Sequence, residues 1–207
     1  MALSTYNELK TSIGDWLNRS DLTSVIPDFI NLAEAQIERT LRTRQMTVRT
    51  NISFSSEYAS VPADFLETKS LKLTSTNPQT PLTFLTIDGM DDEATRQSSS
   101  GRPKFFTVIG DQFRLLPVPD GTYTAELTYF AKLSKLSGSV ATNWLLASSP
   151  DAYLYGALLQ AAPYLQDDAR ITTWATLYER ALNDLRTADS RGASSGGNLV
   201  ARAKTFG

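Results

Sequence analysis

The hydrophobic pattern of this chain changes its period twice, and this change constrains the fold more than any other feature. Apolar side chains recur at helical spacing in residues 1–45, alternate in short stretches of residues 46–148, and return to helical spacing in residues 149–189. Helices and strands segregated in this way predict an α+β fold rather than an α/β fold. We expect a helical bundle built from an N-terminal and a C-terminal helix pair, with a small antiparallel β region inserted between them.

The first segment carries specific helix signals. Thr5 and Glu8 have the spacing of a capping box, in which a hydroxyl and a carboxylate each bind a free backbone N–H. Pro27 suits the first turn of a second helix, where its missing N–H costs nothing. The apolar stripe of that second helix comprises Phe29, Ile30, Ala33, Ile37 and Leu41, and we expect Glu34, Glu38, Arg39 and Arg42 elsewhere around it.

The middle segment contains one clear hairpin. Residues 105–109 and 112–116 flank Gly110 and Asp111, and glycine supplies the positive φ that such a tight turn requires. Alternation also predicts strands in residues 48–54, 71–73, 82–85 and 123–129. We expect a short helix over 88–97 and a turn over 98–103, and we interpret the strands as one small antiparallel sheet.

The C-terminal segment begins with a second set of helix signals. Ser149, Pro150 and Asp151 are typical of a helix N-terminus. Small residues follow that allow a neighbouring helix to approach closely: Gly156, Ala157, Ala161 and Ala162. Asp167 and Asp168 are expected to open the last helix, whose apolar stripe comprises Ile171, Trp174, Ala175, Tyr178, Ala181, Leu182 and Leu185. Residues 190–197 have the composition of a flexible linker.

Composition excludes several classes of site. The chain has no cysteine and no histidine, so disulfides, thiolate nucleophiles, zinc ribbons, iron–sulfur clusters and Ser-His-Asp triads are all ruled out. No Gly-rich phosphate loop occurs, and we expect no cofactor and no bound metal. Acid–base hydrolysis by paired carboxylates would need Asp91, Asp92 and Glu93, or Asp167 and Asp168. Acids near a helix N-terminus are usually structural, and we favour that interpretation here.

No stretch of the sequence is long and apolar enough for a membrane span, and the N-terminus lacks the pattern of a secretory signal. We therefore expect a soluble protein of the cytoplasm in which it is made, with no membrane partner. The formal net charge of −2 argues against a protein whose whole surface binds nucleic acid, but it leaves room for a local basic patch.

The strongest basic cluster comprises Arg39, Arg42, Arg44 and Arg49. Three interpretations are open: phosphate contacts with nucleic acid, docking on an acidic protein surface, or a solvated helix C-terminus, where arginine favours the helix dipole. A second set of candidates lies in the basic tail of residues 190–207, which carries Arg191, Arg202, Lys204 and Phe206. A partner groove could supply the apolar burial that such a tail lacks, and a frayed terminus is the alternative.

Several local patterns, in order and spacing, resemble those of tailed-bacteriophage head–tail adaptor proteins. The matching stretches are residues 27–34, 37–42, 61–66, 116–123, 127–133, 142–146, 149–158 and 161–165. None of them is catalytic, and the resemblance covers most of residues 5–190. The fold known for that family is a helical bundle with an inserted β region.

The resemblance implies a structural protein of the virion neck. Members of the family form a ring, generally of twelve copies, beneath the portal and connect it to tail or nozzle proteins. DNA leaves through the central channel without sequence-specific binding, and we expect the side chains that face the channel to be acidic or neutral. In such proteins the C-terminal tail often reaches along the portal.

Three other functions stay open at this point. The chain could be another virion completion protein, a nucleic-acid-binding module that uses the residues from Arg39 to Arg49, or a carboxylate hydrolase. The three tryptophans, Trp16, Trp144 and Trp174, lie on apolar stripes, and we expect them in the core rather than at subunit interfaces.

Overall fold

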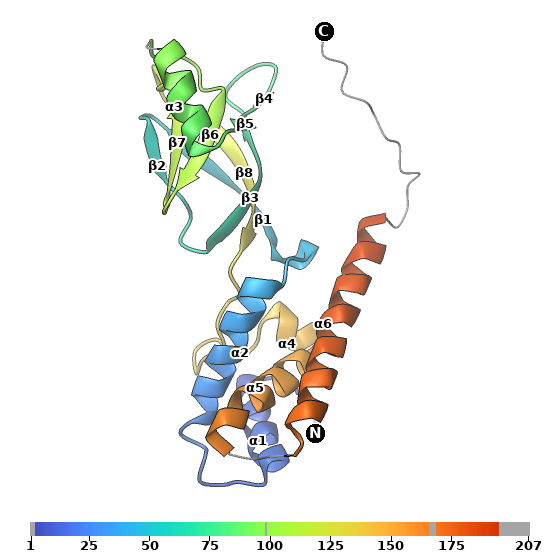
Figure 1. Cartoon of the computed structure of the whole chain (residues 1–207). Coiled ribbons are helices and arrows are strands. Elements are labelled where there is room, and N and C mark those ends of the chain that lie inside the picture. Colours follow the sequence, from blue (N-terminus) through green and yellow to red (C-terminus); the bar gives the residue numbers. More distant parts are fainter. Residues whose placement is uncertain (1–2, 98, 166–168, 195–207) are drawn as a thin grey trace. The chain divides into compact units, whose positions relative to one another are not determined.

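The protein divides into two compact units (Figure 1). The computed structural model describes residues 3–97, 99–165 and 169–194. The helical unit comprises Met1–Gln45 and Leu133–Gly207, and the β unit comprises Met46–Lys132. The chain is thus an α+β protein, as its hydrophobic pattern predicts. The alternating pattern of the sequence spans residues 46–148, and residues 133–148 are grouped with the helical unit.

The described part of the helical unit contains five α-helices. They are α1 (Tyr6–Leu17), α2 (Ile26–Thr40), α4 (Trp144–Ser148), α5 (Pro150–Leu165) and α6 (Ile171–Ser194), with the short 3-10 helix η1 (Arg44–Met46) at the boundary with the β unit. The expected capping box is present, because the Thr5 hydroxyl accepts from the Glu8 N–H and the Glu8 carboxylate accepts from the Thr5 N–H. The C-terminal part contributes three helices rather than a pair.

Helix α5 is the centre of the helical unit, since α1, α2, α4 and α6 all contact it. A Cβ atom on Gly156 would lie 3.0 Å from Tyr178 Cε2 of α6 and 3.3 Å from Ala33 Cβ of α2. Glycine therefore lets the three helices pack closely where they meet, as the run of small residues predicts.

Helix α6 continues beyond the predicted start of the linker at residue 190 and ends at Ser194. The prediction is wrong for residues 190–194 because a tertiary contact outweighs their weak helix propensity. Arg44 Nη1 donates to the Gly192 carbonyl over 2.9 Å and so holds the last turn of the helix. Asp167 and Asp168, expected to open this helix, lie outside the described residues.

The β unit contains two four-stranded sheets rather than one small sheet. The strands are β1 (Thr47–Phe54), β2 (Tyr58–Ser60), β3 (Phe65–Leu73), β4 (Thr80–Pro81), β5 (Thr83–Phe84), β6 (Phe105–Ile109), β7 (Gln112–Leu116) and β8 (Tyr123–Ala131). The orders are β1-β8-β3-β4 and β2-β7-β6-β5. The β5–β6 pair is parallel, so the antiparallel prediction is also wrong for this pair. Helix α3 (Ile87–Arg96) lies in the connection between β5 and β6, and parallel strands need such a crossover.

One apolar core lies between the two sheets. Phe113 is completely buried, and its ring makes edge-to-face contacts with Phe54, Phe65 and Phe106. The hairpin of β6 and β7 forms as predicted, and Gly110 at its turn has a φ of 59°. The core of this unit is built from hydrophobic side chains contributed by both sheets.

Candidate protein-interaction surfaces

Glu34 is the charged residue whose position differs most from the prediction. We expect it on the polar side of α2, whereas its side chain is fully buried. Its Oε1 atom accepts the Leu136 N–H over 2.8 Å and the Tyr153 hydroxyl over 3.0 Å. Its spacing could have revealed this position, because Glu34 lies four residues after Ile30 and three before Ile37, on the apolar stripe itself.

A polar network extends from Glu34 to neighbouring segments. Asn143 Nδ2 lies 2.6 Å from the Tyr153 hydroxyl, and Asn143 Oδ1 caps α4 by accepting the Leu146 N–H. One turn after Glu34, Glu38 Oε1 accepts the Leu133 N–H over 3.1 Å. We call Glu34, Glu38, Asn143 and Tyr153 the Glu34 network. It fixes the segment that returns from the β unit onto α2 and α5.

The electrostatics of the Glu34 network reflect its burial. Burial raises the pKa of the Glu34 carboxyl, and the hydrogen bonds from Leu136 and Tyr153 oppose that shift. Its second oxygen, Oε2, is buried and has no hydrogen-bond partner among the described residues. The pKa of the Tyr153 hydroxyl is raised by burial and by the nearby Glu34 charge. Because Glu34 is inaccessible, the network acts in positioning the chain and not on an external substrate.

The predicted basic cluster is divided between the two units. Arg39, Arg42 and Arg44 belong to the helical unit, whereas Arg49 lies in β1 and forms an ion pair with Glu126 over 3.4 Å. Arg39 is exposed near the end of α2. Arg42 Nη1 donates to the Glu38 and Leu41 carbonyls over 2.7 Å, so this side chain satisfies the C-terminus of α2.

Arg44 links the end of the α2 segment to α6. Its backbone N–H and its Nε both donate to Asp189 Oδ1, over 2.8 and 3.1 Å, in addition to the contact with Gly192. Arg186 adds a bond from Nη2 to the Thr40 carbonyl over 3.2 Å. Arg191 is exposed on the last turns of α6. The other predicted interaction residues, Arg202, Lys204 and Phe206, lie outside the described residues.

The candidate catalytic carboxylates have structural contacts. Asp91 on α3 forms an ion pair with Arg114, which also pairs with Glu57 over 2.8 Å. Glu93 pairs with Arg96, three residues along the same helix. In the part of the chain that the structure describes, no group of three or more acidic side chains is arranged to hold a metal ion. These carboxylates therefore hold α3 and the β1–β2 turn against β7.

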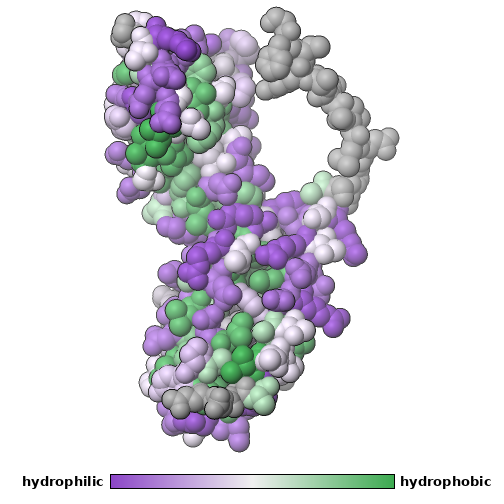
Figure 2. Space-filling model, in the orientation of Figure 1, coloured by the Kyte–Doolittle hydropathy of each residue, from purple (hydrophilic) through white to green (hydrophobic). Residues whose placement is uncertain are grey.

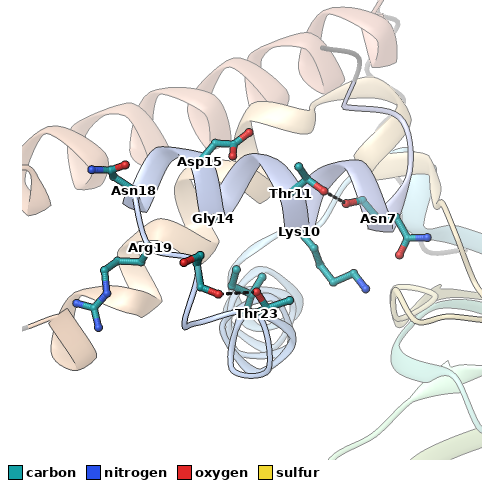
Figure 3. Close-up of a pocket in the computed structure, with 10 residues that line it drawn as sticks. Asn7, Lys10, Thr11, Gly14, Asp15, Asn18, Arg19 and Thr23 are labelled. Atoms are coloured by element: carbon teal, nitrogen blue, oxygen red, sulfur yellow. Dashed lines mark hydrogen bonds between the residues drawn. The ribbon is translucent and has the colours of Figure 1, made fainter.

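A polar cavity of about 650 Å³ lies along α1 and the loop that follows it (Figure 3). Both of its cations are engaged, because Lys10 lies over the Tyr6 ring and Arg19 forms two hydrogen bonds with Asp21. The hydroxyls of Thr11 and Thr23 donate hydrogen bonds to nearby backbone carbonyls. The cavity thus offers a hydrophilic surface and no paired nucleophile and base.

Trp16 is more exposed than its place on an apolar stripe predicts. Its side chain is 45% exposed, whereas Trp174 is buried and Trp144 is half-buried. The Trp16 ring makes an edge-to-face contact with Tyr155 of α5, at 5.8 Å between centroids. Figure 2 shows hydrophobic surface, in green, on the helical unit among hydrophilic side chains. The expectation that all three tryptophans lie in the core is therefore wrong for Trp16.

No helix in the described ranges is long and apolar enough to cross a bilayer. A family model described as SU10 adaptor protein matches residues 4–201, which include nearly all of both units. No curated protein matches the chain.

Proposed function

The chain belongs to the SU10 adaptor protein family, a family of phage head-to-tail adaptors, and from this membership we propose that it forms a ring beneath the portal of a tailed phage. The ring, generally of twelve copies in such proteins, would join the portal to tail or nozzle proteins and surround the DNA exit channel. The observation that carries the proposal is the family match, because it spans the helical unit and the inserted β unit together.

A closed ring requires each copy to present two different surfaces to its neighbours. Exposed aromatic and apolar side chains on the helical unit, namely Trp16, Leu32 and Tyr164, supply one set of candidates. Phe84 and Ile87 supply another on the β unit. Interfaces are enriched in aromatic residues, and this composition supports a role in assembly.

The proposed role is binding rather than catalysis. The Glu34 network and the Arg114 ion pairs use the conspicuous carboxylates to hold segments together. Arg39 and Arg191 are exposed and are proposed to contact partner proteins, together with Arg202, Lys204 and Phe206 of the tail. Arg42 and Arg44 also make contacts within the helical unit, so we propose that they position Arg39 and α6 for this docking.

Native mass spectrometry tests the proposed function. The purified protein is measured alone and after mixing with portal rings from the same virus, with an unrelated ring-shaped protein as the control. We expect the portal mass to increase by a full complement of copies, while the control ring keeps its mass. A portal that keeps its own mass at saturating protein would contradict the proposal. A comparison of the protein alone with the mixture also shows whether ring assembly requires the portal.

A further inference from the structure

A pocket of about 400 Å³ lies beside Trp16, between α1 and the first turns of α5. Leu3, Trp16, Pro150, Leu154 and Tyr155 give it an apolar and aromatic lining. We call it the Trp16 pocket. It is large enough for one aromatic side chain, and the exposed Trp16 ring forms one wall. Aromatic side chains of this kind are typical anchors of protein interfaces.

The rim of the Trp16 pocket is acidic. Asp15 and Asp151 both line the pocket, and both are exposed. Within the described part of the chain, neither carboxylate takes part in an ion pair. Arg170 donates to the Trp16 carbonyl, and its guanidinium lies over the Trp174 ring. The pocket therefore suits a large apolar residue flanked by cations.

The chain itself contains a segment with that chemistry. Residues 202–206 read Arg-Ala-Lys-Thr-Phe, with two cations followed at once by an aromatic residue and no acid among them. We propose that this segment of one copy docks in the Trp16 pocket of the next copy, with Phe206 in the pocket and Arg202 and Lys204 at Asp15 and Asp151. The proposal names the partner in the proposed ring and so rests on the proposed function.

Distance favours a second copy over the same chain. The contact between Arg170 and Trp16 places the pocket beside the start of α6, whereas residue 195 follows its end. A helix of 24 residues is about 36 Å long. The twelve residues 195–206 reach at most about 43 Å when fully extended, so a return to the pocket of the same copy leaves almost no slack. A tail that docks on the next copy links the copies head to tail, as ring closure requires.

Disulfide trapping tests this inference, because the natural chain has no cysteine. The test protein is the full chain with Leu3→Cys in the pocket lining and Thr205→Cys beside Phe206. The matched control combines Thr205→Cys with Ser139→Cys, an exposed position elsewhere on the helical unit. Both proteins are oxidised alone and after mixing with portal rings, then separated on a non-reducing denaturing gel. We expect a ladder of dimers, trimers and larger multimers from the test protein only.

Substitutions in the tail, and one in the rim of the pocket, make the test specific. Phe206→Ala should reduce the cross-linked multimers at least about tenfold, as expected for a buried aromatic anchor. Arg202→Glu with Lys204→Glu should have a similar effect, and Asp15→Lys added to that pair should restore part of the ladder. Lysine is compatible with position 15, because this residue lies near the C-terminus of α1, where the helix dipole favours cations.

Each outcome separates this inference from the proposed function. A protein that joins portal rings but gives no ladder in either sample overturns the docking and leaves the adaptor role intact. A ladder from a protein that does not join portal rings supports the docking and contradicts the adaptor role. A monomer with an internal disulfide would show that the tail returns to its own pocket. A product that stops at the dimer would show a reciprocal exchange rather than a head-to-tail chain, and either result overturns the inference.

Discussion

The two units of this protein bury different kinds of side chains in their interiors. The β unit buries hydrophobic side chains from two sheets around Phe113 and keeps its ion pairs near the surface. The helical unit buries a carboxylate, Glu34, among its packed helices and uses it to bind a backbone segment and a tyrosine. Apolar packing depends on the volume of the buried side chains. A buried hydrogen-bonding network also depends on the relative positions of its donors and acceptors. The helical unit is assembled from two distant parts of the chain, and the Glu34 network fixes how they meet.

Phe113→Ala should have the largest effect and should be confined to the β unit. The substitution removes a completely buried ring and its three aromatic contacts, which costs about 3–5 kcal/mol in comparable cores. All three tryptophans, Trp16, Trp144 and Trp174, lie in the helical unit, so tryptophan fluorescence follows that unit alone. Urea unfolding by fluorescence, combined with hydrogen exchange of the strand amides, separates the two responses.

The control for this prediction is Phe84→Ala. Phe84 is 57% exposed and contacts the edge of Phe106, so its removal should cost less than about 1 kcal/mol. If Phe113→Ala shifts the fluorescence transition as far as it shifts exchange of the strands, the two units unfold together. The contrast between them would then be structural but not energetic.

Glu34→Ala should have the next largest effect, on the helical unit. It leaves the Leu136 N–H and the Tyr153 hydroxyl without their shared acceptor, at a cost of about 2–4 kcal/mol. Glu34→Gln keeps the acceptor oxygen and removes the buried charge, so it should be much milder. Urea unfolding by tryptophan fluorescence measures both variants. Equal losses from alanine and glutamine would show that the carboxylate, and not the acceptor, holds the returning segment.

The pH dependence of the same pair tests the charge directly. Burial raises the pKa of Glu34 above its ordinary value of 4.5, so the native state binds this proton more tightly than the unfolded state does. The stabilising contribution is therefore fully present below about pH 4.5 and is lost as the pH rises through the native pKa. The free energy of unfolding of the natural protein, minus that of Glu34→Gln, should fall as the pH rises towards neutrality. A difference that stays constant with pH would show that burial does not perturb this group.

The contrast between the units also explains what the sequence could predict. Local signals were reliable where one short stretch determines the structure: the capping box of Thr5 and Glu8, the hairpin around Gly110, and the small residues around Gly156. These features depend on near neighbours or on residue size. The alternation of β8 is equally clear, because one face of that strand is buried from Ala125 to Ala131.

The failures all depend on distant partners. The spacing of Glu34 places it on the apolar stripe, but the groups that make burial of its carboxylate possible, the Leu136 N–H and the Tyr153 hydroxyl, come from distant segments. The end of α6 depends on Arg44, almost 150 residues away. One sheet is predicted where two form, because strands as short as β2 and β4 have no pattern of their own and form only beside longer strands. The exposure of Trp16 depends on which faces of α1 other helices cover, and the apolar stripe of the sequence alone does not show this.

Gly156→Ala should have an intermediate effect on the helical unit. The new methyl group would lie closer to Tyr178 and Ala33 than ordinary contacts allow, and overpacking of this kind costs about 1–3 kcal/mol. Gly138→Ala is the matched control, because a Cβ there meets no atom within 4 Å. Thermal unfolding followed by tryptophan fluorescence compares the two variants. A neutral Gly156→Ala would mean that α6 can move away from α5 without loss, and that the helical unit is less tightly specified than its network indicates.

The smallest effects should come from the arginine that links two elements in each unit. Arg114 joins Glu57 and Asp91 and is 15% exposed, whereas Arg44 joins Asp189 and Gly192 and is 54% exposed. Solvent screens the contacts of Arg44 more strongly than those of Arg114. Arg114→Met should therefore lower the free energy of unfolding by about 1–2 kcal/mol, and Arg44→Met by less than about 1 kcal/mol. Urea unfolding at low and high salt measures both, and the larger part of the Arg44 effect should disappear in salt.

Arg44→Met should affect hydrogen exchange at the end of α6 more than it affects the stability of the whole helical unit. The last turn of α6 is helical where the sequence alone favours a linker, and Arg44 provides the contact that holds it. Without that side chain, amides near the end of α6 should exchange faster while those near Trp174 keep their protection, because terminal turns open independently of the core. Hydrogen exchange by mass spectrometry resolves the two ends of the helix. Uniform protection along α6 in the variant would show that residues 190–194 stay helical without the Arg44 contact, and that the helix end does not depend on a distant partner.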